Sequence, residues 1–247
     1  MTKRLTANKS EDGFSLFELI IAMTLTLVVL TVATTLIARS LNMRTRSNEN
    51  VDALADAERA LNIMSREIAQ AGFNLEDNGI VPEDSFVDAN GNSTIRIRAN
   101  LNRYDTAAGN GARENISLPV EDSGEDVKYF IHPAGTTTLL ARYDRFAPVG
   151  SESTVLANRL DRFRVHYFAQ RVTYATPNCG TSLDARCCDI ENPSAAEVAP
   201  AAARYVVIAV CVQQGATGAP GGPGYQPAHN LLLTSDVALR NANLLNY

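Results

Sequence analysis

One carboxylate stands at the start of a long apolar stretch, in a place where its charge needs a partner. Residues 13–18 read Gly-Phe-Ser-Leu-Phe-Glu, and the nineteen residues from Leu19 to Ile37 contain no charged side chain. A carboxylate about one turn into a membrane helix costs a few kcal/mol unless a cation neutralises it. Glu18 is therefore either an interfacial residue with its carboxylate in water or one half of a charge pair.

Four thiols form the second group of residues with a distinctive chemistry. They are Cys179, Cys187, Cys188 and Cys211. An even number of clustered cysteines behind an export signal is typical of a disulfide framework, so we expect two disulfides and a periplasmic or external domain. A bond between the adjacent Cys187 and Cys188 would be strained, which leaves each to pair with Cys179 or Cys211. The alternatives are a zinc site, which would lack C-x-x-C spacing and a nearby histidine, and a set of buried thiols.

The apolar stretch is long enough to cross a membrane as a helix. Nineteen residues at about 1.5 Å each span roughly the hydrocarbon core of a bilayer. Its threonines, at positions 24, 26, 31, 34 and 35, can donate hydrogen bonds to backbone carbonyls of the preceding turn. A secretory signal peptide is the alternative, but its apolar region is usually only about 7–15 residues long and ends in a small-residue cleavage site.

Helical spacing continues beyond the apolar stretch. One stripe holds Val51, Leu54, Leu61, Met64 and Ile68, with charged residues on the opposite face. Gly72 is expected to end the helix, with Phe73 packing just beyond it. A helix over residues 14–71 would be about 87 Å long. A free-standing coiled coil is the alternative, but the heptad pattern does not persist.

After Gly72 the apolar pattern changes to a period of two residues. We predict strands at residues 93–98, 127–132, 138–143, 162–168, 204–212 and 231–239. In the segment 162–168, the odd-numbered residues Phe163, Val165 and Tyr167 should face the core, and Arg162, Arg164 and His166 should face solvent. Turn pairs such as Asn90-Gly91 and Ser123-Gly124, with no helix between the strands, favour an antiparallel sheet. The Gly- and Pro-rich residues 215–227 should form a surface loop.

Residues 13–38, GFSLFELIIAMTLTLVVLTVATTLIA, resemble the class III signal and N-terminal helix of type IV prepilins and pseudopilins. In that family a membrane peptidase cuts after the glycine and methylates the new N-terminal residue. The resemblance implies cleavage between Gly13 and Phe14 and methylation of Phe14. It also implies that Glu18 pairs with the Phe14 ammonium of a neighbouring subunit and acts in filament assembly.

Later segments resemble PilW-like minor pilins and the J pseudopilin of type II secretion. They are LNIMSREIAQAGF, EDVKYFIHPAGTTTLLAR, LANRLDRFRVHYF and SDVALRN. The implied fold is the α+β type IV pilin fold, a long N-terminal helix packed on an antiparallel β-sheet domain. Its expected parts are a leader (1–13), a transmembrane and filament-core helix (14–38), an amphipathic continuation (39–72) and an extracytoplasmic β-rich domain (73–247).

The resemblance implies a minor pilin that is processed by prepilin peptidase and takes part in type IV pilus assembly. Its partners would be other major and minor pilins, reached through the N-terminal helix. The chain would first span the inner membrane once, with its C-terminal domain in the periplasm, and then join the pilus. The alternatives are a type II secretion pseudopilin and a membrane-anchored periplasmic binding domain.

No motif points to catalysis. The three histidines, His132, His166 and His229, stand in no metal-binding frame, and no nucleophile elbow, phosphate loop or dinucleotide fingerprint is present. Residues 88–92 resemble a calcium loop only superficially, because the glycine is out of register, so we expect a solvated hairpin there. The net charge of −5 disfavours a nucleic-acid partner. We therefore expect a protein that is not an enzyme and that has no cofactor and no metal.

Overall fold

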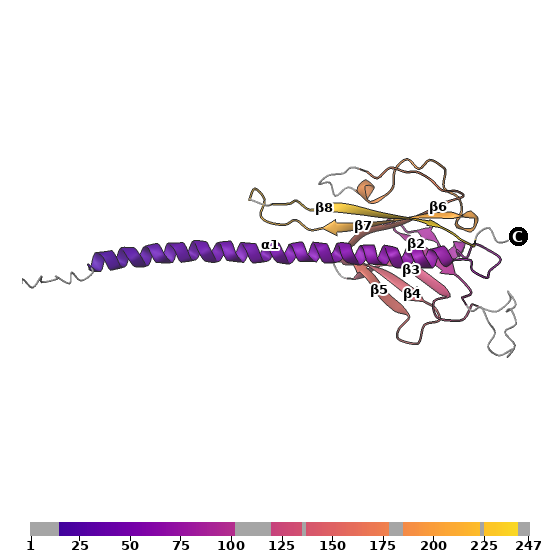
Figure 1. The fold of residues 1–247 in the computed structure, drawn as a ribbon, viewed down its shortest axis with the longest axis horizontal. Helices are drawn as coiled ribbons and strands as arrows, with labels where there is room; N and C mark the ends of the chain where they lie inside the picture. Colours follow the sequence, from indigo (N-terminus) through magenta and orange to yellow (C-terminus); the bar gives the residue numbers. More distant parts are fainter. Residues whose placement is uncertain (1–14, 102–119, 135–136, 178–184, 223–224, 242–247) are drawn as a thin grey trace, which may run out of the picture. The chain divides into compact units, whose positions relative to one another are not determined.

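The computed structural model describes residues 15–101, 120–134, 137–177, 185–222 and 225–241. The chain forms two compact parts, residues 1–45 and 46–247. One helix, α1 (Leu16–Gln70), contributes to both parts, and Figure 1 traces it through the chain. The predicted continuous helix is thus confirmed from Leu16 onward.

In the first part, α1 exposes apolar side chains all round. Every described side chain from Ser15 to Asn42 is exposed. All five threonines of the apolar stretch donate their hydroxyl hydrogen to a carbonyl three or four residues earlier, as predicted; the Thr31 Oγ1 to Leu27 O distance, for example, is 2.7 Å. By length and composition this is a helix that could cross a membrane.

In the second part, α1 buries a stripe that differs from the predicted one. The buried helical residues are Ala53, Ala57, Ala60, Leu61, Met64 and Ile68. Leu61, Met64 and Ile68 were predicted, but Leu54 is only partly buried and Val51 is 61% exposed. The prediction was wrong at the start of the stripe because small alanine side chains, which carry little hydrophobic signal, make up the buried face of the helix there.

The helix ends where the sequence predicts. Gly72 follows two residues after Gln70 with φ at 75°, and its N–H donates to Arg98 O at 2.9 Å. A Cβ atom at Gly72 would lie 2.6 Å from Asp77 O, so the chain reverses here in backbone contact that only glycine allows.

The larger sheet is an antiparallel meander of five strands in the order β1-β2-β3-β4-β5. The strands are β1 (Phe86–Val87), β2 (Ser93–Arg98), β3 (Asp126–Ala134), β4 (Thr137–Asp144) and β5 (Ser153–Asn158). Short 3-10 turns accompany the strands, η1 (Pro82–Asp84) before β1, and η3 (Ala185–Cys188) and η4 (Pro200–Ala202) later in the chain. The strands β1 and β5 were not predicted, because β1 has two residues and β5 lacks an alternating pattern.

The smaller sheet has three antiparallel strands in the order β6-β7-β8. They are β6 (Leu160–Phe168), β7 (Tyr205–Gln214) and β8 (His229–Ala238). The outer edge of β6 is bonded to side chains from the start of β2: Phe163 N–H donates to Asn92 Oδ1 (3.2 Å) and Val165 N–H to Ser93 Oγ (2.9 Å). The predicted antiparallel strands are present, but they form two sheets joined by these bonds rather than one.

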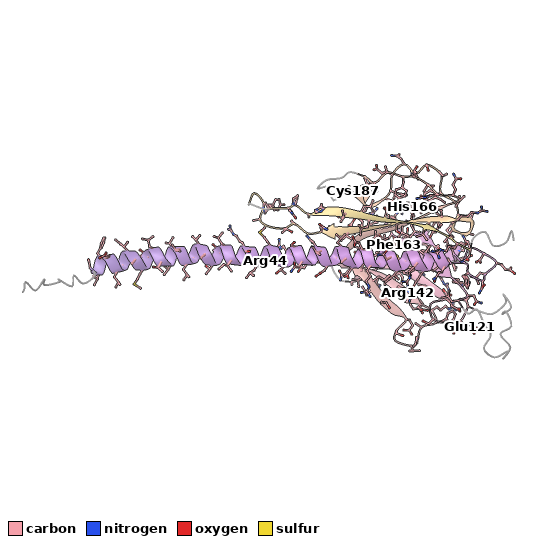
Figure 2. The ribbon with its side chains drawn as sticks, viewed as in Figure 1. Arg44, Glu121, Arg142, Phe163, His166 and Cys187 are labelled. Carbon is pink, nitrogen blue, oxygen red and sulfur yellow. A yellow bond between two sulfur atoms is a disulfide. The ribbon has the colours of Figure 1, made fainter. Side chains whose placement is uncertain are left out.

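The core lies where the alanine-rich stripe of α1 meets the inner faces of both sheets. It includes Ile95 of β2, Tyr129 of β3, Leu140 of β4, Phe163 of β6 and Ile208 of β7, all fully buried. Figure 2 labels Phe163 within this layer and Arg142 on the larger sheet.

One ionic contact joins α1 to the larger sheet. Arg142 Nε lies 3.0 Å from Glu67 Oε2, and the Tyr129 hydroxyl donates to the same carboxylate. Burial raises the pKa of Tyr129, so its hydroxyl remains protonated and keeps this donor role.

The smaller sheet is also covered on its second face. Phe168, Val172, Tyr205 and Val207 form a separate apolar cluster beneath the connection between β6 and β7. The sequence predicted that His166 faces solvent on this side, but its exposure is 4%. Alternation correctly assigned it to the face opposite Phe163. It could not reveal that a long connection folds back over that face.

Candidate functional site

The described structure begins at the helix start that carries Glu18. Ser15 Oγ accepts the N–H of Phe17 (3.3 Å) and Ser15 O accepts the N–H of Leu19 (3.1 Å), so Ser15 is the N-cap. Glu18 is then the third helical residue, which is the position of the acidic partner in a capping box. The Ser-x-x-Glu spacing at residues 15–18 was present in the sequence and would have identified this cap.

Glu18 is exposed in the first turn of α1, where the helix dipole favours a negative charge. Within the described segments, no cationic side chain forms an ion pair with it. Gly13 and Phe14, the predicted cleavage and methylation residues, lie outside the described residues. Glu18 is thus available for a counter-charge from its own N-terminus or from another chain.

The side chains around Glu18 are large, apolar and uncovered. Leu16 is 76% exposed, Phe17 71% and Leu19 55%. An apolar surface of this extent in a folded protein is normally covered by lipid or by other apolar helices. What this end of the molecule can do is insert into a membrane or pack with similar helices.

A comparison with known protein families finds a motif in this segment. Residues 8–34 match the prokaryotic N-terminal methylation motif. This motif is a type IV prepilin-like signal and supports a type IV pilin-like protein that prepilin peptidase processes. It covers the predicted junction, the helix cap and most of the apolar stretch. No curated protein and no solved structure matches the chain.

One disulfide is described in the sheet domain. Cys188 in η3 is bonded to Cys211 in β7, with Cα atoms 5.1 Å apart. This is one of the two partners that the sequence allowed for Cys188. Cys187 is also disulfide-bonded, and Cys179 lies outside the described residues. The bond fastens the connection that covers the smaller sheet to its central strand.

The described residues offer no strong metal site. Asp161 lies beside Cys188 and Cys211, close enough for three ligands, but both sulfurs are used in the disulfide and cannot act as thiolates. At the calcium-like sequence, Asp88 Oδ1 accepts the N–H of Asn90 (2.9 Å) and of Asn92 (2.7 Å). Asp88 therefore closes the β1–β2 turn, as expected for a hairpin.

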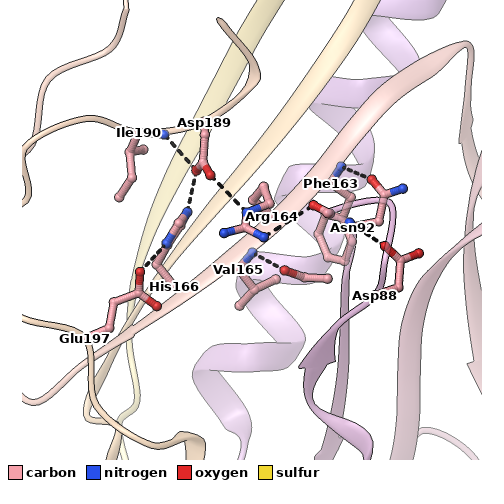
Figure 3. A network of polar contacts seen from close by, with 11 residues as sticks. Asp88, Asn92, Phe163, Arg164, Val165, His166, Asp189, Ile190 and Glu197 are labelled. Carbon is pink, nitrogen blue, oxygen red and sulfur yellow. Dashed lines mark hydrogen bonds and ion pairs between the residues drawn. The ribbon is translucent and has the colours of Figure 1, made fainter. Parts of the chain in front are cut away.

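A polar network at His166 fastens the same connection (Figure 3). His166 Nε2 lies 2.6 Å from Asp189 Oδ1, and Nδ1 lies 2.9 Å from Glu197 Oε1. Arg164 Nε donates to the other oxygen of Asp189 at 2.9 Å. Burial alone would lower the pKa of His166, but the two carboxylates outweigh it and raise the pKa to about 9. Both ring nitrogens are occupied, so His166 holds the fold together rather than exchanging protons with a substrate.

The Gly- and Pro-rich loop meets α1 at the start of the second part. Arg46 Nη1 donates to Ala216 O (3.2 Å), and the Asn50 side chain exchanges hydrogen bonds with the backbone of Gly215. Glu49, the residue before Asn50, forms an ion pair in which its Oε2 lies 2.8 Å from Arg159 Nη2. These contacts, which the sequence did not predict, attach the helix to the loops at one end of the sheet domain.

Proposed function

We propose that this chain is a minor pilin of a type IV pilus, cleaved after Gly13 and methylated on Phe14. The observation that carries the proposal is the methylation motif at residues 8–34, on a helix that is uncharged and uncovered from Leu19 to Ile37 and becomes the core helix of an α+β domain. A minor rather than a major pilin is favoured by the chain length of 247 residues.

Cleavage would give the apolar helix two successive environments. Before assembly, residues 14–38 cross the inner membrane, with the sheet domain in the periplasm. In the filament, the same surface packs against the helices of other pilins. Glu18 would then meet the ammonium of a neighbouring Phe14, and this pair would set the axial position of the subunit. The disulfide at Cys188 supports an oxidising compartment for the sheet domain.

The processing step can be tested directly. Mass spectrometry of the protein from cells with active prepilin peptidase should find an N-terminus at Phe14 that bears one methyl group. Gly13→Leu should leave the leader attached, because the peptidase needs close approach to the backbone at that residue. Ser10→Leu, in the same leader, is the matched control and should be processed normally. Recovery of only the intact Met1 terminus from the wild type would refute the proposal.

The finer assignment needs a second experiment. Deletion of the gene should reduce the number of surface pili, and the protein should co-purify with pilin subunits. A secretion defect with normal piliation would instead assign the chain to a type II secretion system. Protease added to spheroplasts should degrade the sheet domain while the helix is protected, and full protection of the domain would contradict the periplasmic orientation.

A further inference from the structure

Three hollows meet around the C-terminal end of β8. One of about 610 Å³ lies between the end of β8 and residues 169–171 and 204–205. A second, of about 460 Å³, lies between β8 and the α1 face of residues 62–70, and a third, of about 310 Å³, lies at the end of α1. The first two share Asp236 and Ala238, and the last two share Ala69, Gln70 and Arg240. The three adjoin one another at these shared residues, and the surface that they make up is called here the β8 groove.

The β8 groove is lined by four exposed arginines: Arg66, Arg171, Arg204 and Arg240. None of them forms an ion pair with a carboxylate among the described residues, whereas Arg96, Arg142, Arg159 and Arg164 all do. Among the described residues of the lining, Asp236 is the acidic one, and its Oδ1 accepts the Tyr174 hydroxyl at 2.6 Å. A local excess of positive charge thus stands on a chain whose net charge is −5.

Backbone bonds fix the elements that carry these arginines. Leu239 N–H donates to Arg204 O (2.9 Å), and Arg240 N–H donates to Ala69 O (3.4 Å). The Asn241 side chain donates to Gln70 O, the last carbonyl of α1, at 3.3 Å and to the following Ala71 O at 3.2 Å. Arg66, Arg204 and Arg240 therefore project from α1, from the residue before β7 and from the segment just after β8, and these bonds hold the three places in one arrangement before any ligand binds. Arg171 comes from the connection that follows β6.

We propose that the β8 groove binds an acidic, extended segment of a partner protein. β8 is the outer strand of its sheet, so an extended peptide can bond to its backbone edge while side-chain carboxylates reach the arginines. Guanidinium groups bind carboxylates in a bidentate manner. A nucleic acid is disfavoured because a net negative chain repels a long polyanion, whereas a short acidic segment meets only the local charge. This proposal does not depend on the function proposed above.

The test uses the full-length protein in nanodiscs of neutral lipid and a fluorescein-labelled peptide, Glu-Val-Glu-Val-Glu-Val-Glu. Fluorescence anisotropy should show binding that weakens with added salt. The double variant Arg66→Gln/Arg240→Gln should raise the Kd roughly tenfold. Arg59→Gln/Arg145→Gln removes the same charge from exposed arginines outside the groove and should change the Kd less than about twofold. Asp236→Asn should tighten binding.

Three outcomes would overturn the proposal. The first is equal binding by the groove variant and the wild type, with near-UV circular dichroism showing both folded. The second is equal binding of a peptide in which glutamine replaces every glutamate. The third is tighter binding of single-stranded DNA of matched charge than of the acidic peptide, which would assign the groove to nucleic acid.

Discussion

Met64→Ala should destabilise the sheet domain far more than Val51→Ala, although the two residues belong to the same predicted stripe. Met64 is fully buried between α1 and the sheets, whereas Val51 is 61% exposed. The change at Met64 removes three heavy atoms, worth about 2.4 kcal/mol of transfer free energy, and leaves a cavity. We expect a total loss of about 3 kcal/mol, which lowers the Tm by roughly 6–12 °C for a domain of this size.

The assay is urea unfolding of the full-length protein in detergent, followed by near-UV circular dichroism. This signal comes from tyrosines in the sheet domain and does not depend on the micelle-bound helix. Val51→Ala should change the free energy of unfolding by less than about 0.5 kcal/mol. Similar losses in both variants, or no loss in Met64→Ala, would refute the close packing of α1 on the two sheets.

Three further predictions concern charge and covalent bonds. Glu18→Gln should leave the urea midpoint of the sheet domain unchanged but lower co-purification with other pilins at least tenfold, because an unpaired buried ammonium costs several kcal/mol; wild-type recovery would make Glu18 an interfacial residue. The raised pKa of His166 means that its stabilisation is complete below about pH 6.5 and is lost as the pH rises through about 9. His166→Gln should therefore lower the free energy of unfolding at pH 6 and weaken its fall between pH 6.5 and 9. If this free energy falls as steeply in the variant as in the wild type, the stabilising role of the His166 ion pairs is contradicted. Cys188→Ser/Cys211→Ser should cost about 3 kcal/mol in urea unfolding, since the bond closes a loop with a sequence separation of 23 residues, whereas an unchanged midpoint would show that the bond does not form.

The sequence predicted the structure best where a single physical requirement determines the local fold. An uncharged apolar run, threonines that can bond backward and Gly72 at the end of the periodic segment predicted α1 closely. Alternation predicted the inward residues of β6, because Phe163 and Val165 face the shared core. Each of these features depends on neighbours in sequence or on a single apolar layer.

Features that depend on distant contacts could not be predicted in this way. Ala57 and Ala60 carry almost no hydrophobic signal, yet they are fully buried in the core that α1 shares with both sheets. The alternating pattern predicts that His166 lies at the surface, because the pattern does not show that the segment with Asp189 and Glu197 covers it. The β8 groove combines arginines from α1, from the connection between β6 and β7 and from the segment just after β8, which are far apart in sequence.

The hydrogen bonds of the α1 threonines affect how the helix would partition between lipid and a bundle of other apolar helices. Each hydroxyl already donates to a carbonyl of its own helix, as Thr26 does to Ala22 O. Moving the helix from lipid to a bundle of helices therefore neither makes nor breaks a hydroxyl hydrogen bond. Dispersion contacts, chain entropy and the ionic state of Glu18 remain to decide the direction of transfer. If the chain has the function proposed above, this property would let the helix leave the bilayer for the filament and return to it, and the charge pair proposed for Glu18 would bias the exchange.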